Sequence, residues 1–208
     1  MTLVFRNLVR LMLRCLFGLL GGVTITGLEN IPKEGAVILT PNHLSHVDPL
    51  LVGMAVPRPA WFLATDELFT IPVLGTVARL LRAVPIRQDA PDRRALRLAE
   101  GLLSQNEAMV VFPEGHESLD GRLQPLQGGV MLLAVRTGAK ILPVAIAGSE
   151  RMLPPREWRP RHAGSPISLR FGKAIEVSDM TGGAGGRPGL DQGIRRLEAE
   201  IRRLMELG

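Results

Sequence analysis

The sequence is poor in several residue types, and each shortage argues against a class of protein. It contains no tyrosine, two tryptophans and six phenylalanines, so few aromatic rings are present to stack on nucleic-acid bases. Its single cysteine, Cys15, excludes an internal disulfide or a cysteine zinc cluster and fits a reducing compartment. Lysine occurs only at positions 33, 140 and 173, so arginine supplies most of the positive charge. We therefore expect neither a nucleic-acid-binding domain nor a disulfide-rich secreted domain.

The properties that remain are those of a basic and rather apolar domain. The chain has 208 residues, which suits one α/β domain with a full core better than two domains. Hydrophobic residues make up 46% of it, and the formal net charge is +5. A basic protein with so high a content of apolar residues is suited to an anionic membrane surface.

The first 22 residues form an apolar segment that arginines interrupt at helical spacing. Arg6, Arg10 and Arg14 lie four residues apart, so a helix places them on one face. The apolar stretch from Cys15 to Val23 is much shorter than the roughly 20 residues needed to span a bilayer. The arginines are also spread along the segment, whereas a signal peptide has its charges at the start. We expect an amphipathic helix lying in the plane of a membrane surface; a helix docked on the protein's own core is the alternative.

Residues 23–180 alternate between strand-like and helix-like segments, which indicates one α/β domain. Short apolar or β-branched runs bounded by glycine or proline predict strands, and apolar residues at helical spacing predict helices. The expected strands are 23–26, 35–40, 61–64, 84–86, 108–112, 141–146 and 167–171. The expected helices are 48–56 (with Asp48 as its N-cap), 72–82, 91–103 and 129–136. This order predicts a central, mostly parallel sheet flanked by helices.

A glycine-rich stretch separates this domain from the end of the chain. Residues 181–189 include Gly-Gly-Ala-Gly-Gly and predict a flexible break. Residues 190–207 then carry apolar side chains at helical spacing, among them Leu197 and Ile201. We expect a C-terminal helix packed on or beside the domain.

A histidine and an aspartate five residues apart follow the end of a predicted strand. His43 lies just beyond that end, and α/β sheets bind ligands at the carboxyl ends of their strands. The carboxylate of Asp48 can accept a hydrogen bond from Nδ1 of His43, which leaves Nε2 to take a proton from a hydroxyl group. We interpret the pair as a general base and its orienting acid. Two alternatives stay open: His43, His46 and Asp48 as metal ligands, or loop residues bonded to the backbone.

A second polar cluster follows the most apolar strand of the chain. Phe112, Pro113, Glu114 and Gly115 come directly after it. A carboxylate that emerges from an apolar strand needs a partner, so Glu114 could hold an acceptor hydroxyl or a neighbouring cation. Gly115 permits a close backbone approach, and a free N–H there could stabilise an oxyanion. We therefore expect residues 112–115 to bind substrate.

Taken together, these motifs resemble a known family. Asn-His-x-Ser-x-x-Asp at 42–48, followed by Phe-Pro-Glu-Gly at 112–115, is similar to the glycerol-phosphate and lysophosphatidate acyltransferases. Residues 83–87 and 141–144 resemble the second and fourth motifs of that family. Residues 67–75, with Glu67-Leu68-Phe69, Ile71-Pro72 and Gly75, resemble the segment before the second motif.

The resemblance implies an O-acyltransferase that needs no metal and forms no covalent acyl-enzyme. His43 would be the base, Asp48 its orienter, and coenzyme A or acyl carrier protein would deliver the acyl group as a thioester co-substrate rather than a cofactor. The implied acceptor is a lysolipid, with 1-acylglycerol-3-phosphate first. The implied location is the cytoplasmic face of the cell membrane, as a peripheral or monotopic protein.

The sequence departs from the family pattern mainly at cations. The family's second motif begins with glycine and ends with arginine, and here Arg82 and Gln88 occupy those places, with Arg87 one position early. The third motif usually continues Thr-Arg-Ser, and here it reads His116-Glu117-Ser118. Residues Thr65 and Gln127 replace two further lysines.

In the family such cations are thought to receive the phosphate of the acceptor. We expect Arg82 and Arg87, with Arg79, to restore the charge from shifted positions. Otherwise the acceptor is a different lipid, such as a lyso-ornithine-type lipid, a glycolipid or another lysophospholipid. A non-catalytic lipid-binding relative is the further alternative.

Overall fold

The computed structural model describes residues 3–70, 78–79, 82–87, 92–157, 159–183 and 186–207. Its strands form one sheet in the order β1-β7-β6-β2-β5-β3-β4. The strands are β1 (Val23–Thr26), β2 (Val37–Pro41), β3 (Ala60–Thr65), β4 (Ala83–Ile86), β5 (Ala108–Val110), β6 (Lys140–Ala147) and β7 (Ile167–Phe171). The α-helices include α1 (Leu3–Leu19), α2 (Asp48–Ala55), α4 (Arg93–Ser104), α5 (Gly129–Thr137), α6 (Ser149–Met152), α7 (Val177–Thr181) and α8 (Gly186–Glu206). Two 3-10 helices, η1 (Leu28–Asn30) and η2 (Asp66–Thr70), join them.

The sheet is parallel at every pair of neighbours except one. Strand β2 lies at its centre, with β5 and β6 as parallel partners, and β7 runs antiparallel to β6 but parallel to β1. All five residues of β2 are buried, as expected for a strand covered on both faces. The predicted α/β fold with a mostly parallel sheet is confirmed.

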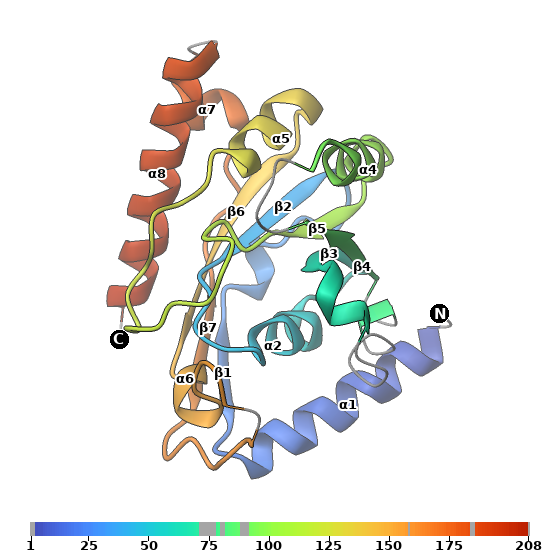
Figure 1. The fold of residues 1–208 in the computed structure, drawn as a ribbon, viewed down its shortest axis with the longest axis vertical. Helices are drawn as coiled ribbons and strands as arrows, with labels where there is room; N and C mark the ends of the chain where they lie inside the picture. Colours follow the sequence, from blue (N-terminus) through green and yellow to red (C-terminus); the bar gives the residue numbers. More distant parts are fainter. Residues whose placement is uncertain are drawn as a thin grey trace.

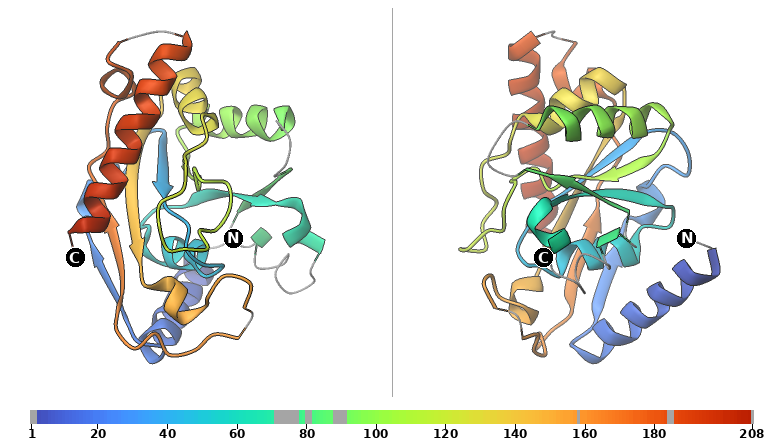
Figure 2. Two further views of the ribbon diagram at one scale, coloured as in Figure 1. Left: turned by 60° about the vertical axis from the view of Figure 1, so that its left-hand side comes forward. Right: turned by 45° about the vertical axis from the view of Figure 1, so that its right-hand side comes forward.

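Helices cover both faces of this sheet (Figures 1 and 2). Val37 and Leu39 of β2 point into a core that includes Leu51 and Val52 of α2 and Phe17 of α1. The intervening Ile38 points to the other face, into a core shared with α4, α5 and α8. The alternation of side chains along a strand thus divides the core into two layers.

Helix α1 packs beside α2 and leaves much of its own surface uncovered. Phe17 is buried against the domain, and Leu13 and Leu20 pack around it. A stripe of apolar side chains on the same helix is exposed: Leu8, Leu11, Met12, Cys15, Leu16 and Leu19. Among the described residues, no helix combines the length and the apolar character needed to cross a membrane.

Two local expectations are corrected by the structure. Asp48 is the first helical residue of α2, and Val47 is its N-cap. The Asp48 carboxylate accepts hydrogen bonds from the preceding loop. The C-terminal helix begins at Gly186 instead of residue 190, and α7 already occupies Val177–Thr181, so the glycine-rich segment is only partly a break. Most of the helix predicted at 72–82 lies outside the described residues. Of the residues in this range that the structure describes, Ala78 and Arg79 are helical.

Candidate active site

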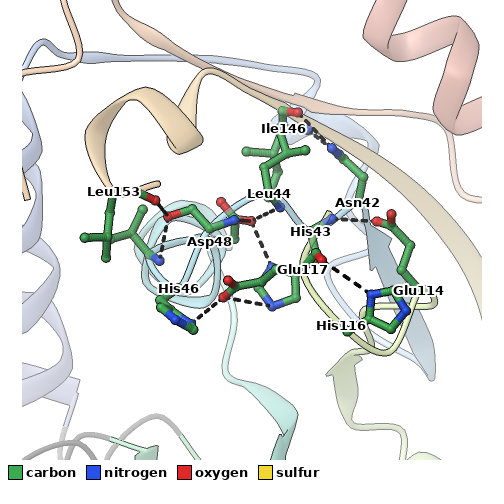
Figure 3. A network of polar contacts seen from close by, with 12 residues as sticks. Asn42, His43, Leu44, His46, Asp48, Glu114, His116, Glu117, Ile146 and Leu153 are labelled. Atoms are coloured by element: carbon green, nitrogen blue, oxygen red, sulfur yellow. Dashed lines mark hydrogen bonds and ion pairs between the residues drawn. The ribbon is translucent and has the colours of Figure 1, made fainter. Parts of the chain in front are cut away.

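The two motif loops meet at the carboxyl edge of the sheet. Strands β2 and β5 are parallel neighbours, so residues 42–48 and 111–118, which follow them, leave the sheet side by side (Figure 3). A backbone hydrogen bond joins the loops, from the Ser118 N–H to the His43 carbonyl at 2.8 Å. The topology therefore brings together residues that lie about 70 positions apart in the sequence.

The imidazole of His43 is held by the carboxylate of Asp48. Nδ1 of His43 lies 2.9 Å from Oδ2 of Asp48. The same oxygen accepts the N–H groups of Leu44 at 2.6 Å and Ser45 at 2.8 Å. Asp48 is fully buried, whereas the His43 side chain is 15% exposed. Because a carboxylate only accepts hydrogen bonds, this geometry places the proton of neutral His43 on Nδ1 and leaves Nε2 as the basic nitrogen.

Two other polar residues of the same motif anchor its backbone. The side-chain amide of Asn42 donates to the carbonyl of Ile146 at 3.0 Å and accepts the Ile146 N–H at 2.7 Å. The Ser45 hydroxyl donates to the carbonyl of Leu153 at 2.6 Å. Both side chains are buried, so their bonds fix the loop to β6 and the segment after α6. Their roles follow from contacts distant in the sequence, which the motif itself did not reveal.

Phe112 and Glu114 support His43 from the neighbouring loop. The Phe112 ring lies against the imidazole, with 4.2 Å between ring centroids. Oε1 of Glu114 accepts the backbone N–H of His43, and Oε2 accepts that of Gln124, both at 2.7 Å. Glu114 is 1% exposed, and this burial raises the pKa of its carboxyl although both amide bonds oppose the shift. The partner that a buried carboxylate requires is thus the polypeptide backbone.

Gly115 has a backbone conformation that favours glycine, but its N–H is engaged. Its φ is +79°, and a Cβ there would lie 2.1 Å from the side-chain nitrogen of Gln127. Its N–H donates to the carbonyl of Phe112 at 3.1 Å, which closes a turn. The prediction of a free Gly115 N–H for an oxyanion was therefore wrong. Pro113 is buried, and its carbonyl accepts the Gln127 N–H at 2.8 Å.

Glu117 brings a second carboxylate to the imidazole. Its Oε1 forms an ion pair with Nδ1 of His46 and lies 3.9 Å from Nε2 of His43 (Figure 3). The hydrogen bond to Glu117 raises the pKa of His46, the effect of burial being smaller and opposite. Glu117 was noted in the sequence only as a departure from a motif, since its proximity to His46 depends on the two loops meeting. His116, by contrast, is exposed.

Two of the three arginines expected near an acceptor phosphate, Arg82 and Arg87, lie at different edges of the sheet; the third, Arg79, lies over the Phe69 ring at 5.7 Å. Arg82 precedes β4, so it lies at the amino end, where its guanidinium is 3.9 Å from the Glu107 carboxylate and 5.3 Å from the centre of the Trp61 ring. Arg87 follows β4 and is exposed at the carboxyl edge. Strand β4 is three positions from β2, or about 14 Å at the usual strand spacing. This placement argues against Arg82 as a contact for an acceptor bound at His43.

The histidines of the loop do not form a recognisable metal site. Within the described ranges, no group of three or more His, Cys, Asp or Glu side chains is arranged to hold a metal ion. Oδ2 of Asp48 instead accepts hydrogen bonds from backbone and imidazole N–H groups, as described above.

Comparison with known proteins agrees with this arrangement. Residues 22–147 match the Acyltransferase family. The chain belongs to this family. The matched region holds the sheet from β1 to β6 and both motif loops, so the acyltransferase motifs and the contacts between His43, Asp48 and Glu114 fall within it.

Its relatives include named acyltransferases. A chloroplastic 1-acyl-sn-glycerol-3-phosphate acyltransferase of Brassica napus is 29% identical over 133 residues, which cover 62% of this chain and 38% of the relative. An enzyme with the same activity name in Borreliella burgdorferi is 30% identical, with 60% of this chain and 50% of the relative covered. The chain thus spans half or less of the length of these two relatives.

A solved acyltransferase has the same fold. The crystal structure of the 1-acyl-sn-glycerophosphate acyltransferase PlsC from Thermotoga maritima matches with a TM-score of 0.79 and 27% sequence identity. The match covers 97% of this chain and 79% of that chain.

Proposed function

We propose that this protein transfers a fatty acyl group from an acyl thioester to the hydroxyl group of a lysolipid. The observation that carries the proposal is the oriented His43–Asp48 pair at the carboxyl edge of the sheet, in a chain of the acyltransferase family. The thioester is carried on coenzyme A or acyl carrier protein. No metal or other cofactor takes part.

The reaction uses Nε2 of His43 as the general base. It removes the proton of the acceptor hydroxyl as the oxygen attacks the thioester carbonyl, and the new C–O bond replaces the C–S bond. The proton then passes from His43 to the departing thiolate. Asp48 stabilises the transient imidazolium through Nδ1, as the carboxylate of a hydrolase triad does.

The other motif residues position this base in the proposed mechanism. Phe112 limits the tilt of the imidazole, and Glu114 fixes the main chain of His43. Pro113 and Gly115 shape the turn that carries Glu114. We propose that residues 112–115 border the acceptor while Glu114 itself positions His43, and that Arg87 is the arginine available to a long headgroup.

The decisive experiment replaces the base. His43→Ala is expected to lower kcat/KM for transfer from a labelled acyl thioester to a lysolipid by at least about a thousandfold, because proton removal is lost. His116→Ala is the matched control, since His116 is exposed on the neighbouring loop. Equal activity in wild type and His43→Ala would refute His43 as the general base. No transfer by wild type to any lysolipid would refute acyl transfer itself and favour a lipid-binding role.

We also propose that α1 holds the protein on the cytoplasmic face of a membrane. The exposed stripe of α1 presents Leu11, Met12 and Leu19, which are 58–79% exposed, while the opposite side of the helix packs on the domain. An apolar stripe on a helix that also exposes Arg14 suits the boundary between headgroups and acyl chains.

Vesicle binding tests this placement. The double change Leu11→Glu/Leu16→Glu should release the protein from anionic vesicles, as should removal of residues 1–20. The matched control is Leu98→Glu/Leu207→Glu, which changes two exposed leucines outside α1. Undiminished binding of the α1 variant in a sedimentation assay would contradict the placement.

The acceptor has two candidates. The relatives named above are 1-acyl-sn-glycerol-3-phosphate acyltransferases, which makes 1-acylglycerol-3-phosphate the first candidate. The second is a lysolipid without that phosphate, such as a lyso-ornithine-type lipid or a glycolipid. Two observations favour the second candidate. Arg82 lies at the opposite edge of the sheet from His43, and Glu117 occupies the position where the family pattern has an arginine.

A further inference from the structure

Glu117 places a negative charge beside the atom that must receive the acceptor's proton. Its carboxylate oxygen lies 3.9 Å from Nε2 of His43, and its side chain is only 12% exposed. A hydroxyl that donates to Nε2 must approach within about 3 Å of it. The atoms bonded next to that hydroxyl therefore enter the space bordered by Glu117.

The position of this carboxylate is fixed by the fold. His46, from the loop before α2, forms an ion pair with Glu117. The next residue, Ser118, donates its backbone N–H to the carbonyl of His43. Glu117 is thus tied on both sides to the loop that carries the base, and its distance from His43 follows from these two contacts.

The charges around the base are predominantly negative. Asp48 and Glu114 are buried beside His43, and Glu117 completes a set of three carboxylates. Within the described part of the chain, no arginine or lysine forms an ion pair with any of the three. The partner of Glu117 is His46, which carries a positive charge when protonated and whose side chain is 40% exposed.

We infer that Glu117 determines acceptor specificity by selecting a headgroup that donates hydrogen bonds next to the reacting hydroxyl, and by disfavouring a phosphate there. This inference rests on the proposed function and favours the second of its two acceptors. A carboxylate only accepts hydrogen bonds, so it binds a hydroxyl or ammonium group well. A phosphate offers it oxygen atoms of the same charge, and like charges at this separation repel.

A pair of acceptors that differ only in the phosphate tests the inference. The kcat/KM for acyl transfer is measured with 1-acylglycerol and with 1-acylglycerol-3-phosphate, presented in the same neutral vesicles. Wild type is expected to favour the unphosphorylated acceptor at least tenfold. Glu117→Gln should reduce this ratio because the charge is lost in a side chain of nearly the same shape. Glu117→Arg should invert it, since arginine binds phosphate through paired N–H groups.

Two controls separate charge from damage to the fold. Glu34→Arg makes the same change of charge at an exposed position before β2, at the amino edge of the sheet, and should leave the ratio unchanged. Thermal unfolding of each variant shows whether Glu117→Arg is folded, and Glu117→Gln keeps the test valid if it is not.

Each result decides a separate claim. A wild-type preference for the phosphorylated acceptor, or a ratio that is the same in wild type, Glu117→Gln and Glu117→Arg, overturns the role of Glu117 while acyl transfer stands. Transfer by wild type to neither acceptor or any other lysolipid removes the proposed function, and the inference with it.

Discussion

The loops at 42–48 and 111–118 flank the same imidazole but are built differently. In the first loop, the polar side chains of Asn42, Ser45 and Asp48 turn inward and bind the backbone. In the second, Glu114 turns inward in the same way, whereas Glu117 turns outward to the space beside Nε2. The inward residues follow the acyltransferase pattern, and the departures lie on the outward part. Inward polar groups hold His43, the proposed base, in place, so variation of the acceptor is expected at the outward ones.

The largest effect that tests this division is expected at Asp48. Asp48→Asn keeps the size of the side chain and an oxygen for the amides of Leu44 and Ser45, but it removes the charge that stabilises the His43 imidazolium. By analogy with the Asp→Asn change in a serine protease triad, kcat/KM should fall about 10³- to 10⁴-fold.

Enzyme assays with a saturating thioester measure this loss, and circular dichroism shows that the fold persists. Asp120→Asn changes an exposed acid in the neighbouring loop and should retain nearly full activity. A loss of less than tenfold in Asp48→Asn would show that the first loop does not orient the base.

An intermediate effect is expected at Glu114. Glu114 accepts the backbone N–H groups of His43 and Gln124. In Glu114→Gln, the amide NH₂ group faces one of these two donors, so one buried hydrogen bond is lost. This loss should lower the free energy of unfolding by about 2 kcal/mol. Misplacement of His43 should lower kcat about 10- to 100-fold with little change in KM.

Denaturant unfolding and steady-state kinetics distinguish the two possible roles of this carboxylate. A positioning role predicts the combined loss of stability and kcat. A variant with normal stability and a raised KM for the acceptor would instead place Glu114 among the groups that touch substrate.

The smallest effect is expected at the ion pair that joins the two loops, between His46 of the first loop and Glu117 of the second. The pKa of His46 is raised above 6.5 by Glu117, so the pair stabilises the folded protein fully below that pH and loses its effect as pH rises through the raised pKa. His46→Gln should therefore lower the Tm by about 2 °C near pH 5.5 and by much less near pH 9, since a partly exposed pair contributes little.

Thermal melts of wild type and His46→Gln at both pH values measure the difference. His162→Gln, which alters another exposed histidine, should show no such dependence on pH. A constant difference between wild type and His46→Gln would mean that protonated His46 does not pair with Glu117.

Much of the fold was predictable because local pattern and tertiary environment agree. The strand predicted at 35–40 contains the apolar run Val37–Leu39, and the observed strand Val37–Pro41 is the fully buried centre of the sheet. The antiparallel direction of β7 was not predictable. Side chains alternate between the two faces of a sheet in the same way in parallel and antiparallel strands, so the residue pattern does not show the direction. The start of α8 was placed too late because its glycines suggested a break. Gly193 shows what the helix gains from glycine: a Cβ there would lie 2.5 Å from the terminal methyl of Met131 in α5.

The site was predictable to the same extent. His43 and Asp48 are close in sequence, so their hydrogen bond followed from spacing and the strand before them. Glu114 and Glu117 contact His43 from about 70 residues later in the chain, and neither spacing nor composition shows which way a loop side chain turns. The sequence also did not show that Arg82 and Arg87 are separated: Arg82 comes before β4 and Arg87 after it, so they lie at opposite ends of the strand.

The packing of α1 against α2 has a consequence for how substrate reaches the base. Asp48 is the first residue of α2, so the helix with the exposed apolar stripe packs directly against the helix that begins at the proposed orienting acid. With α1 embedded among headgroups as proposed, the height of His43 above the lipid is constant, and a lysolipid meets it by lateral diffusion without leaving the bilayer. The effective acceptor concentration is then its surface density. The rate should follow the mole fraction of acceptor in the vesicle, and it should be insensitive to bulk dilution once the enzyme is bound.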